Sequence, residues 1–189
     1  MPRRIPADIG QLTGLQALEL SFNHLDGVLP PQLGDLLNLR ILQLHANQLS
    51  GNIPVELGKL VNLQKLFLRT NQLSGSMPPE LGNLSNLLEF RLSDNQLSGG
   101  IPPQLGNLTN LQILRLGANH LTGAIPTELG NLVNLQELDL SYNHLSGALP
   151  PHWDHLLNLQ RLYLQTNQLT GIIPTDLGKL INLQKLYLA

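Results

Sequence analysis

One feature of the sequence limits the possible folds more than any other: asparagine, glycine and proline each recur at an interval of 24 residues. A period of about 20–50 residues is typical of a solenoid, in which each repeat forms one coil stacked on its neighbours. Seven complete repeats run from Leu12 to Lys179, and partial repeats precede and follow them. We therefore expect one repeat array over residues 1–189. The periodic asparagines are Asn23, Asn47, Asn71, Asn95, Asn119, Asn143 and Asn167.

Each repeat reads L-x-x-L-x-x-L-x-L-x-x-N-x-L-x-G-x-[IL]-P-x-x-L-G-x, and each fixed position has a physical reason. The alternation around Leu18 and Leu20 predicts a short strand with one buried face. Asn23 then turns the chain, and its amide can bond to peptide groups that the bend leaves unpaired. Stacked in every coil, these amides predict an internal hydrogen-bonded ladder. The segment from Pro54 to Gly58 predicts one turn of 3-10 or α-helix.

A single repeat of this kind cannot bury its own leucines, so successive repeats must share one core. Leucine supplies 49 of the 189 residues, which is enough for a continuous leucine interior. Parallel pairing of the strands, at about 4.8 Å per coil, predicts a curved rod of roughly 35–40 Å. One face of this rod carries the strands and the opposite face carries the helical turns. The core leucines of one repeat would be Leu60, Leu63, Leu66, Leu68 and Leu73.

Composition excludes several classes of function. The chain has no cysteine, which excludes disulfides, thiol nucleophiles and cysteine-ligated zinc. Its net charge is −2 and charged residues make up 13%, so binding of nucleic acid through bulk positive charge is not expected. No apolar run approaches the ~18 residues of a membrane span. Serine, histidine and acidic side chains never converge in one repeat, so we expect neither an enzyme nor a cofactor.

The repeat resembles the leucine-rich repeat in its 24-residue, plant-specific form, which carries the segment L-x-G-x-I-P. It is similar to the repeats of plant receptor-kinase ectodomains and of polygalacturonase-inhibiting proteins. The resemblance implies a right-handed solenoid with a concave parallel sheet, short helical turns on the convex side and a second short strand near L-x-G-x-I-P. It also suggests an extracellular location. The cysteine-bearing caps and a signal peptide are missing from this sequence, which leaves a cytoplasmic location open and suggests a fragment or module of a larger protein.

Any specific function should reside in the variable positions that lie between and just after the two inward leucines of each strand. Five of the seven aromatic residues fall in these positions, although the core could have held them. Exposed aromatic residues beside arginines are typical of protein-recognition surfaces. We therefore expect a protein or peptide ligand on the concave face. The candidate ligand-binding residues are Lys65, Phe67, Arg69, Arg91, Arg115, Asp139, Tyr142 and Tyr163.

The same positions also predict specific contacts. Arg91 and Arg115 should be cross-strand neighbours, which is mildly destabilising for like charges. Lys65 can pair with Glu89, and Arg115 can pair with Asp139. The alternative without a binding function is that these charges form only a solvent-exposed ladder of ion pairs that contributes little to stability. If the arginines act as a binding site, a carboxylate is their natural guest.

Two other functions stay open at this stage. The apolar residues near the two ends should be partly uncovered, which would favour flanking domains or self-association. Those residues are Ile5, Ile9 and Leu12 at one end and Leu180, Leu183, Leu186 and Leu188 at the other. A minor alternative is ice or carbohydrate binding, because a hydroxyl column could order water. The column runs through Asp26, Ser50, Ser74, Ser98, Thr122, Ser146 and Thr170.

Two local motifs have both a functional and a structural interpretation. His152-Trp153-Asp154-His155 breaks the repeat, and two histidines three apart could bind a metal. The favoured interpretation is that Trp153 fills the leucine pocket and Asp154 replaces the turn glycine, with no metal. Asn83 and Asn107 match the N-glycosylation pattern, but the same residues are also the ordinary sequence of this repeat at one of its corners.

Overall fold

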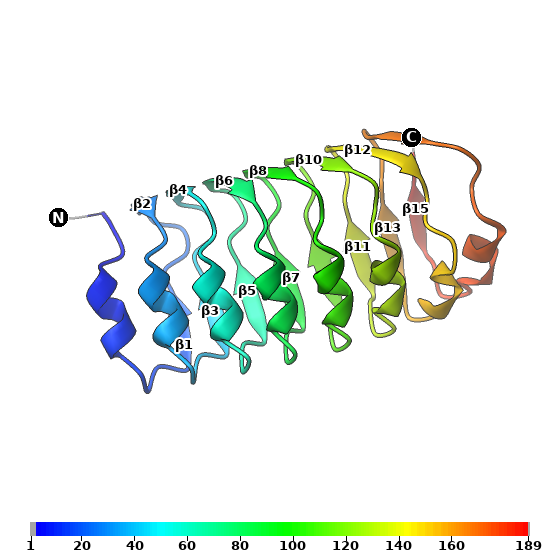
Figure 1. Ribbon diagram of the computed structural model, residues 1–189. Helices are drawn as coiled ribbons and strands as arrows, with labels where there is room; N and C mark the ends of the chain where they lie inside the picture. Colours follow the sequence, from blue (N-terminus) through cyan, green and yellow to red (C-terminus); the bar gives the residue numbers. More distant parts are fainter. Residues whose placement is uncertain (1–2, 189) are drawn as a thin grey trace.

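The structure is a computed structural model that describes residues 3–188, which form a curved stack of coils (Figure 1). Each complete coil contains a strand of a larger sheet, a strand of a smaller sheet and a short 3-10 helix. Met1, Pro2 and Ala189, which the expected array includes, lie outside the described residues. Among the described residues, no helix combines the length and apolar character needed to cross a membrane.

The larger sheet is parallel and has one strand per coil. Each strand pairs in register with its equivalent 24 residues further along, so that Leu66 lies opposite Phe90 and Arg91 opposite Arg115. The predicted parallel sheet and the predicted Arg91–Arg115 neighbours are confirmed. Within residues 3–188 its strands are β1 (Ala17–Glu19), β3 (Ile41–Gln43), β5 (Lys65–Phe67), β7 (Glu89–Arg91), β9 (Ile113–Arg115), β11 (Glu137–Asp139), β13 (Arg161–Tyr163) and β15 (Lys185–Tyr187).

The smaller sheet follows the asparagine turn in each coil and runs along the upper edge of the molecule in Figure 1. This is the second short strand that the family resemblance implied. Its strands, also parallel, are β2 (Asp26–Val28), β4 (Gln48–Gly51), β6 (Gln72–Ser76), β8 (Gln96–Gly99), β10 (His120–Gly123), β12 (His144–Ala148) and β14 (Gln168–Thr170).

The third side of each coil is a single 3-10 turn, as the proline and glycine positions predicted. A glycine near its end lets adjacent coils approach closely, because a Cβ on Gly58 would lie 2.5 Å from the carbonyl oxygen of Glu80. The turns are η1 (Ala7–Gln11), η2 (Pro31–Asp35), η3 (Val55–Lys59), η4 (Pro79–Asn83), η5 (Pro103–Asn107), η6 (Thr127–Asn131), η7 (Trp153–His155) and η8 (Thr175–Lys179).

The leucines of successive coils form one continuous core. The five core leucines expected for the third repeat, Leu60, Leu63, Leu66, Leu68 and Leu73, are all completely buried. Phe90 occupies a strand leucine position of its coil and is buried as well. Burying a leucine or phenylalanine side chain contributes about 1.5–3 kcal/mol, so the shared interior is the main source of stability.

The predicted asparagine ladder is also confirmed. The Asn119 side-chain oxygen accepts the Leu97 N–H at 3.0 Å, and its amide donates to the carbonyls of Leu92 (3.1 Å) and Leu116 (3.0 Å). Each such amide therefore connects its own coil to the preceding one. A second column, which sequence reasoning did not recognise as a ladder, donates to the preceding coil at the opposite corner, for example from Asn110 to the Ser85 carbonyl at 2.8 Å.

The strands of the larger sheet are shorter than the sequence pattern implied. The variable positions were expected between and just after the two inward leucines, but each strand holds three residues, so the positions after the second leucine, such as Arg69, lie beyond the strand. The residue before the ladder asparagine has a left-handed backbone in every complete coil, as at Thr70 (φ 55°) and Tyr142 (φ 53°). This conformation cannot continue a strand, so it limits the width of the sheet.

The irregular motif has the structural role that was favoured from sequence. Trp153 is 1% exposed and fills the leucine position of its coil. His152 has a left-handed backbone (φ 66°), whereas its equivalent Glu128 lies inside the 3-10 turn of the preceding coil, and η7 is therefore reduced to three residues. Asp154 stands in the glycine position, and its carboxylate accepts a hydrogen bond from Lys179 Nζ at 2.9 Å.

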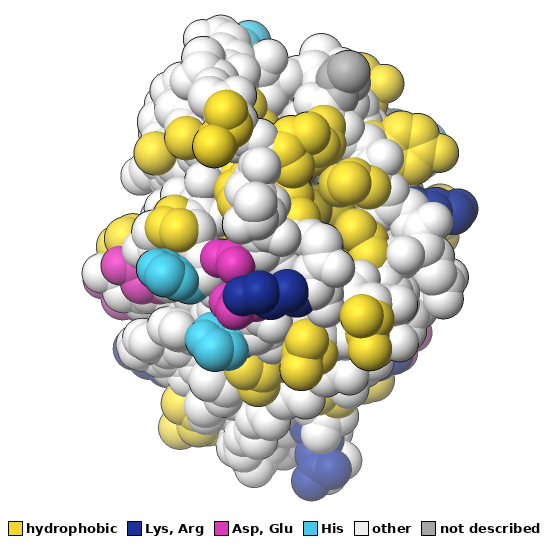
Figure 2. Space-filling model, turned by 90° about the vertical axis from the view of Figure 1, so that its right-hand side faces the viewer, with side chains coloured by type: hydrophobic (Ala, Val, Ile, Leu, Met, Phe, Trp, Pro, Cys, Tyr) yellow, Lys and Arg dark blue, Asp and Glu magenta, His cyan; other side chains and the backbone are white. Residues whose placement is uncertain are grey.

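The expected uncovering of the ends is only partly correct. Ile5 and Leu180 are buried, at 6% and 4% exposure, because each packs into the continuous core. Leu12 and Leu186 are exposed, and Ile9, Leu183 and Leu188 are only partly buried against the core, as expected. Figure 2 shows apolar side chains spread over the C-terminal end, where Ile172, Ile173 and Ile181 are also exposed. Self-association through this end stays a prediction.

The asparagine ladder gives a direct test of the fold. Asn119→Ala leaves the buried Leu97 N–H without its acceptor, whereas the carbonyls of Leu92 and Leu116 keep hydrogen bonds from Asn95 and Asn143, so it should lower the free energy of unfolding by about 1–3 kcal/mol. Asn23→Ala is the matched control, because Asn23 is exposed and, within residues 3–188, bonds only inside its own turn. Urea denaturation measures both variants, and equal effects would show that the inter-coil bonds contribute nothing.

Candidate ligand-binding face

The concave face is the outward surface of the larger sheet, and its side chains come from equivalent positions in successive coils. In β5, for example, Leu66 points into the core while Lys65 and Phe67 point outward and are partly exposed. The five aromatic residues assigned to this face all lie outside the core. Phe22, Tyr142 and Tyr187 are more than half exposed, and the other two, Phe67 and Tyr163, are partly exposed.

The structure divides the eight candidate residues into two groups of four. Lys65, Phe67 and Arg69 lie on or just after β5, and Arg91 lies beside them on β7. Arg115, Asp139 and Tyr163 lie on β9, β11 and β13, and Tyr142 follows β11; these four line one hollow.

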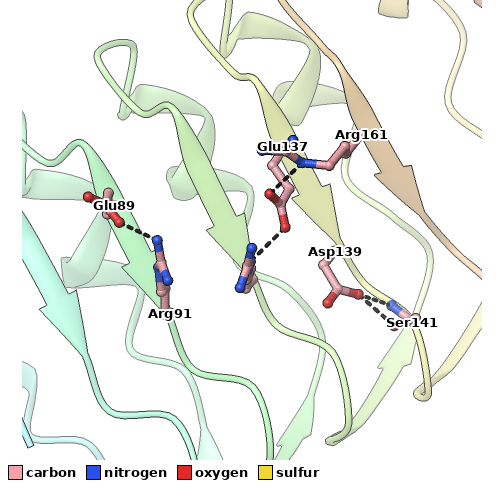
Figure 3. Close-up of polar contacts among 7 residues, drawn as sticks. Glu89, Arg91, Glu137, Asp139, Ser141 and Arg161 are labelled. Carbon is pink, nitrogen blue, oxygen red and sulfur yellow. Dashed lines mark hydrogen bonds and ion pairs between the residues drawn. The ribbon is translucent and has the colours of Figure 1, made fainter. Parts of the chain in front are cut away.

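In the first group the charges are largely satisfied by each other. Lys65 Nζ lies 3.0 Å from the Glu89 carboxylate, which confirms the expected pair. Arg91 donates to the other oxygen of Glu89 at 2.5 Å (Figure 3). The Arg91 guanidinium also lies 4.7 Å from the centre of the Phe67 ring, a cation–π contact. Arg69 makes no ion pair with any residue of the described chain, so it is the arginine of this group with a free charge.

Next to this group, an aromatic row crosses the first three coils. The rings of Phe22 and His45 meet edge to face at 4.9 Å, and those of His45 and Phe67 at 6.1 Å. His45 is 7% exposed, and its Nδ1 hydrogen-bonds to the Ser21 hydroxyl at 2.7 Å. Burial and the positive charges of Arg69 and Arg91 lower the pKa of His45 below its ordinary value, which favours the neutral ring.

In the second group, Glu137 is the central residue, and sequence reasoning placed it wrongly. Its column was expected to face solvent, yet Glu137 is only 3% exposed. Its two oxygens accept hydrogen bonds from Arg115 at 2.6 Å and Arg161 at 2.8 Å (Figure 3). Arg115 therefore pairs with Glu137 and not with Asp139, because the glutamate on the adjacent strand is longer and reaches between both arginines.

The electrostatics of this triad follow from its burial. Burial alone raises the pKa of the Glu137 carboxyl, but the hydrogen bonds from Arg115 and Arg161 outweigh burial and bring it below its usual value. The hydrogen bond to Glu137 also raises the pKa of Arg115. Asp139, released from the expected pair, accepts hydrogen bonds from the Ser141 N–H (3.0 Å) and hydroxyl (2.5 Å) through one oxygen.

The second group surrounds a hollow of about 410 Å³ on the concave face. We call it the Gly117 hollow, because Gly117 lies at its floor where the same column carries a larger side chain in other coils, such as Arg69 or Gln165. The sequence shows that this column contains a glycine, but the hollow can be recognised only once the positions of the surrounding side chains are known. Its other lining residues include Ser93, Asp94, Arg115, Asp139, Tyr142 and Tyr163.

A second cluster of polar groups lies at the irregular coil, away from the concave face. One donor atom each of His152, Asp154 and Asp176 lies within 4.8 Å of the others. Lys179 Nζ lies 2.9 Å from the carboxylates of both Asp154 and Asp176. The ammonium group of Lys179 therefore already provides the positive charge that a metal cation would bring to these carboxylates. Hydrogen bonds from Lys179 lower the pKa of both aspartates. The arrangement is a salt-bridged brace between η7 and η8.

The triad predicts a pH-dependent stability. The pKa of Glu137 is depressed in the folded chain, so its stabilisation is complete above the unfolded value of about 4.3 and is lost as the pH falls through the folded value. Glu137→Gln should lower the free energy of unfolding at pH 7 by about 1–3 kcal/mol, because two arginines lose their counter-charge but can still reach solvent.

Denaturation at pH 7 and pH 3 measures this effect, and the deficit of Glu137→Gln should shrink at pH 3. Glu128→Gln is the control, since Glu128 lies exposed on η6 and pairs with no cation of the described residues. An unchanged deficit at the two pH values would contradict the charged triad.

Comparison with known proteins agrees with this architecture. A family model described as leucine rich repeat matches residues 12–73, and further models of leucine rich repeats match residues 86–108, 110–132 and 133–177. These are repeat families, and no enzymatic family is indicated. No curated protein is similar in sequence at a significant level.

Several solved structures are similar over nearly the whole chain. A plant peptide hormone receptor, RGFR1, in complex with RGF2 has 41% identity and a TM-score of 0.94, covering 96% of this chain and 30% of that chain. The LRR ectodomain of the receptor kinase GASSHO1/SCHENGEN3 from Arabidopsis thaliana, in complex with CASPARIAN STRIP INTEGRITY FACTOR 2, has 42% identity and a TM-score of 0.95, covering 98% and 22%.

A plant ice-binding protein has 31% identity and a TM-score of 0.75, covering 98% of this chain and 67% of that chain. The chain spans less than a third of the length of the two receptor chains. The repeat, the coil geometry and these similarities together show that the chain belongs to the leucine-rich repeat family and resembles the ectodomains of plant receptor kinases.

Proposed function

We propose that this chain is a non-catalytic scaffold that binds a protein or peptide on its concave face, as a module of a receptor-like or signalling protein. The observation that carries the proposal is the Gly117 hollow, an indentation lined by two tyrosines and several charged groups on the concave sheet. Tyrosines in such a position can bury a large area while losing little conformational entropy, which is typical of recognition surfaces.

Two further observations support it. Arg69, Tyr142 and Tyr163 lie on the same face without being required for the core, and neither tyrosine lies in the leucine interior. Among the similar structures, RGFR1 is a plant peptide hormone receptor seen with RGF2, and the receptor kinase HAESA is seen with the peptide hormone IDA and the co-receptor SERK1. Peptide ligands are therefore the first class to test for this chain.

A selection of random peptides on the immobilised chain tests the proposal. The retained peptides should bind the variant with Arg69→Ala, Tyr142→Ala and Tyr163→Ala at least about tenfold more weakly, because each anchor of an interface contributes on the order of 1–2 kcal/mol. These three positions leave the Glu89 and Glu137 ion pairs intact, so the variant should fold normally. Calorimetric titration of individual peptides gives the affinities.

The matched control carries Val61→Ala and Val133→Ala, since both valines are exposed in the turns that follow η3 and η6 on the convex side. Peptides should bind this control and the parent equally well. Peptides that lose affinity for the convex control and keep it for the concave variant would contradict the assignment to the concave face.

Ice binding is a second candidate function, favoured by the similarity to a plant ice-binding protein. The smaller sheet presents a hydroxyl column in which Ser98 and Thr122 are exposed, at a spacing of about 4.8 Å per coil. If this column binds ice, the chain should show thermal hysteresis, and Ser98→Lys with Thr122→Lys should abolish it. Arg69→Ala on the concave face should leave it unchanged, and a parent chain without hysteresis excludes this function.

A further inference from the structure

The Gly117 hollow is formed by a missing side chain in an otherwise regular column. A Cβ added at Gly117 would lie 2.8 Å and 3.0 Å from the two carboxylate oxygens of Asp139, so the hollow brings that carboxylate close to its floor. The volume of about 410 Å³ falls within the range of roughly 300–1,000 Å³ that is usual for small-ligand pockets. The hollow can therefore admit one large side chain of a bound peptide.

The charges around the hollow do not favour an anion. Arg115 and Arg161 share the carboxylate of Glu137, which leaves one positive charge on these three residues. The carboxylates of Asp94 and Asp139 supply two negative charges and form no ion pair within residues 3–188. Together, these five side chains carry a net charge of −1, from +1 on the triad and −2 on the two aspartates. Two of the arginines that were expected to bind a carboxylate, Arg91 and Arg115, are thus paired with Glu89 and Glu137, and Arg69 does not line the hollow.

The hydrogen-bonding groups of the wall point to the same conclusion. The Gln165 side-chain oxygen and the Ser93 hydroxyl are buried and have no hydrogen-bond partner in the part of the chain that is described. Ser141 bonds to one oxygen of Asp139, and the second oxygen accepts no hydrogen bond from the described residues. Buried polar atoms are normally paired. The Gln165 and Asp139 oxygens are acceptors and the Ser93 hydroxyl can accept, so the wall suits a guest that donates several hydrogen bonds.

We propose that the Gly117 hollow receives a basic side chain of the bound peptide, with arginine preferred over lysine. This inference rests on the proposed peptide-binding function and names the chemical class that the concave face selects. A guanidinium group carries five donors in one plane and stacks on aromatic rings, which matches carboxylate and amide acceptors beside Tyr142 and Tyr163. A lysine ammonium satisfies the charge but not the planar arrangement.

Titration with small amides tests the inference without a known ligand. The probes are N-acetyl-arginine amide, N-acetyl-lysine amide, N-acetyl-glutamate amide and the citrulline amide, a neutral analogue of arginine. In two-dimensional NMR spectra, the arginine probe should shift the backbone amide of Gly117 and the side-chain amide of Gln165 saturably. The citrulline probe should bind at least about tenfold more weakly than the arginine probe, since it lacks the charge. The glutamate probe should shift neither signal.

Three variants connect the binding to the hollow. Asp94→Asn with Asp139→Asn should reduce arginine affinity about tenfold, because both negative charges are removed. Gly117→Gln should abolish binding, and it should fold because Gln165 occupies the same position two coils later. Glu80→Gln, on the exposed turn η4, is the matched control and should bind like the parent.

Equal binding of arginine and citrulline, or of the parent and the double asparagine variant, would overturn the inference, as would saturable binding of the glutamate probe. The peptide selection separates this inference from the proposed function. Selected peptides that bind the concave face without any basic residue would refute the cationic guest alone. Failure of the selection with intact binding of the arginine probe would refute peptide recognition but leave the chemistry of the hollow standing.

Discussion

The structure depends on hydrogen bonds that each coil makes to the one before it through a buried asparagine. The Asn119 amide bonds to backbone groups on both sides of the gap between coils, and the same geometry recurs at the other buried positions of the ladder. Because such a bend leaves peptide groups without partners, it is stable only where a neighbour supplies the missing contacts. Leucine packing provides most of the free energy, but the ladder fixes the register that aligns the leucines and, with them, the outward columns.

Much of the fold could be predicted because the repeat averages out local ambiguity. A single alternation of leucines such as Leu66 and Leu68 is a weak signal, whereas its recurrence every 24 residues determines the parallel pairing and the shared core. The role of Trp153 was predictable for the same reason, since its position in the repeat is a buried one. The second asparagine ladder was missed because the repeat pattern treats the position of Asn110 as variable, although its side chain bonds to the preceding coil.

The site was less predictable because side-chain length and neighbouring coils decide it. Glu137 occupies an outward position by pattern, but two flanking arginines cover it and change its role from surface charge to buried bridge. Likewise, the glycine at position 117 is an ordinary substitution in one coil, and it forms a hollow only because Asp139 and Tyr163 stand on the next two. The left-handed residue before each ladder asparagine is not marked by glycine in the sequence, so the true width of the sheet was hidden.

That width has a consequence for any extended guest. With strands only three residues long, a guest cannot align with one strand for any distance and must run across the stack. An extended chain advances about 3.3 Å per residue and the coils about 4.8 Å, so roughly three guest residues pass over every two coils. Adding or removing one coil would shift every later contact by about one and a half residues. In such a protein the number of coils between two binding positions determines specificity as much as the side chains do.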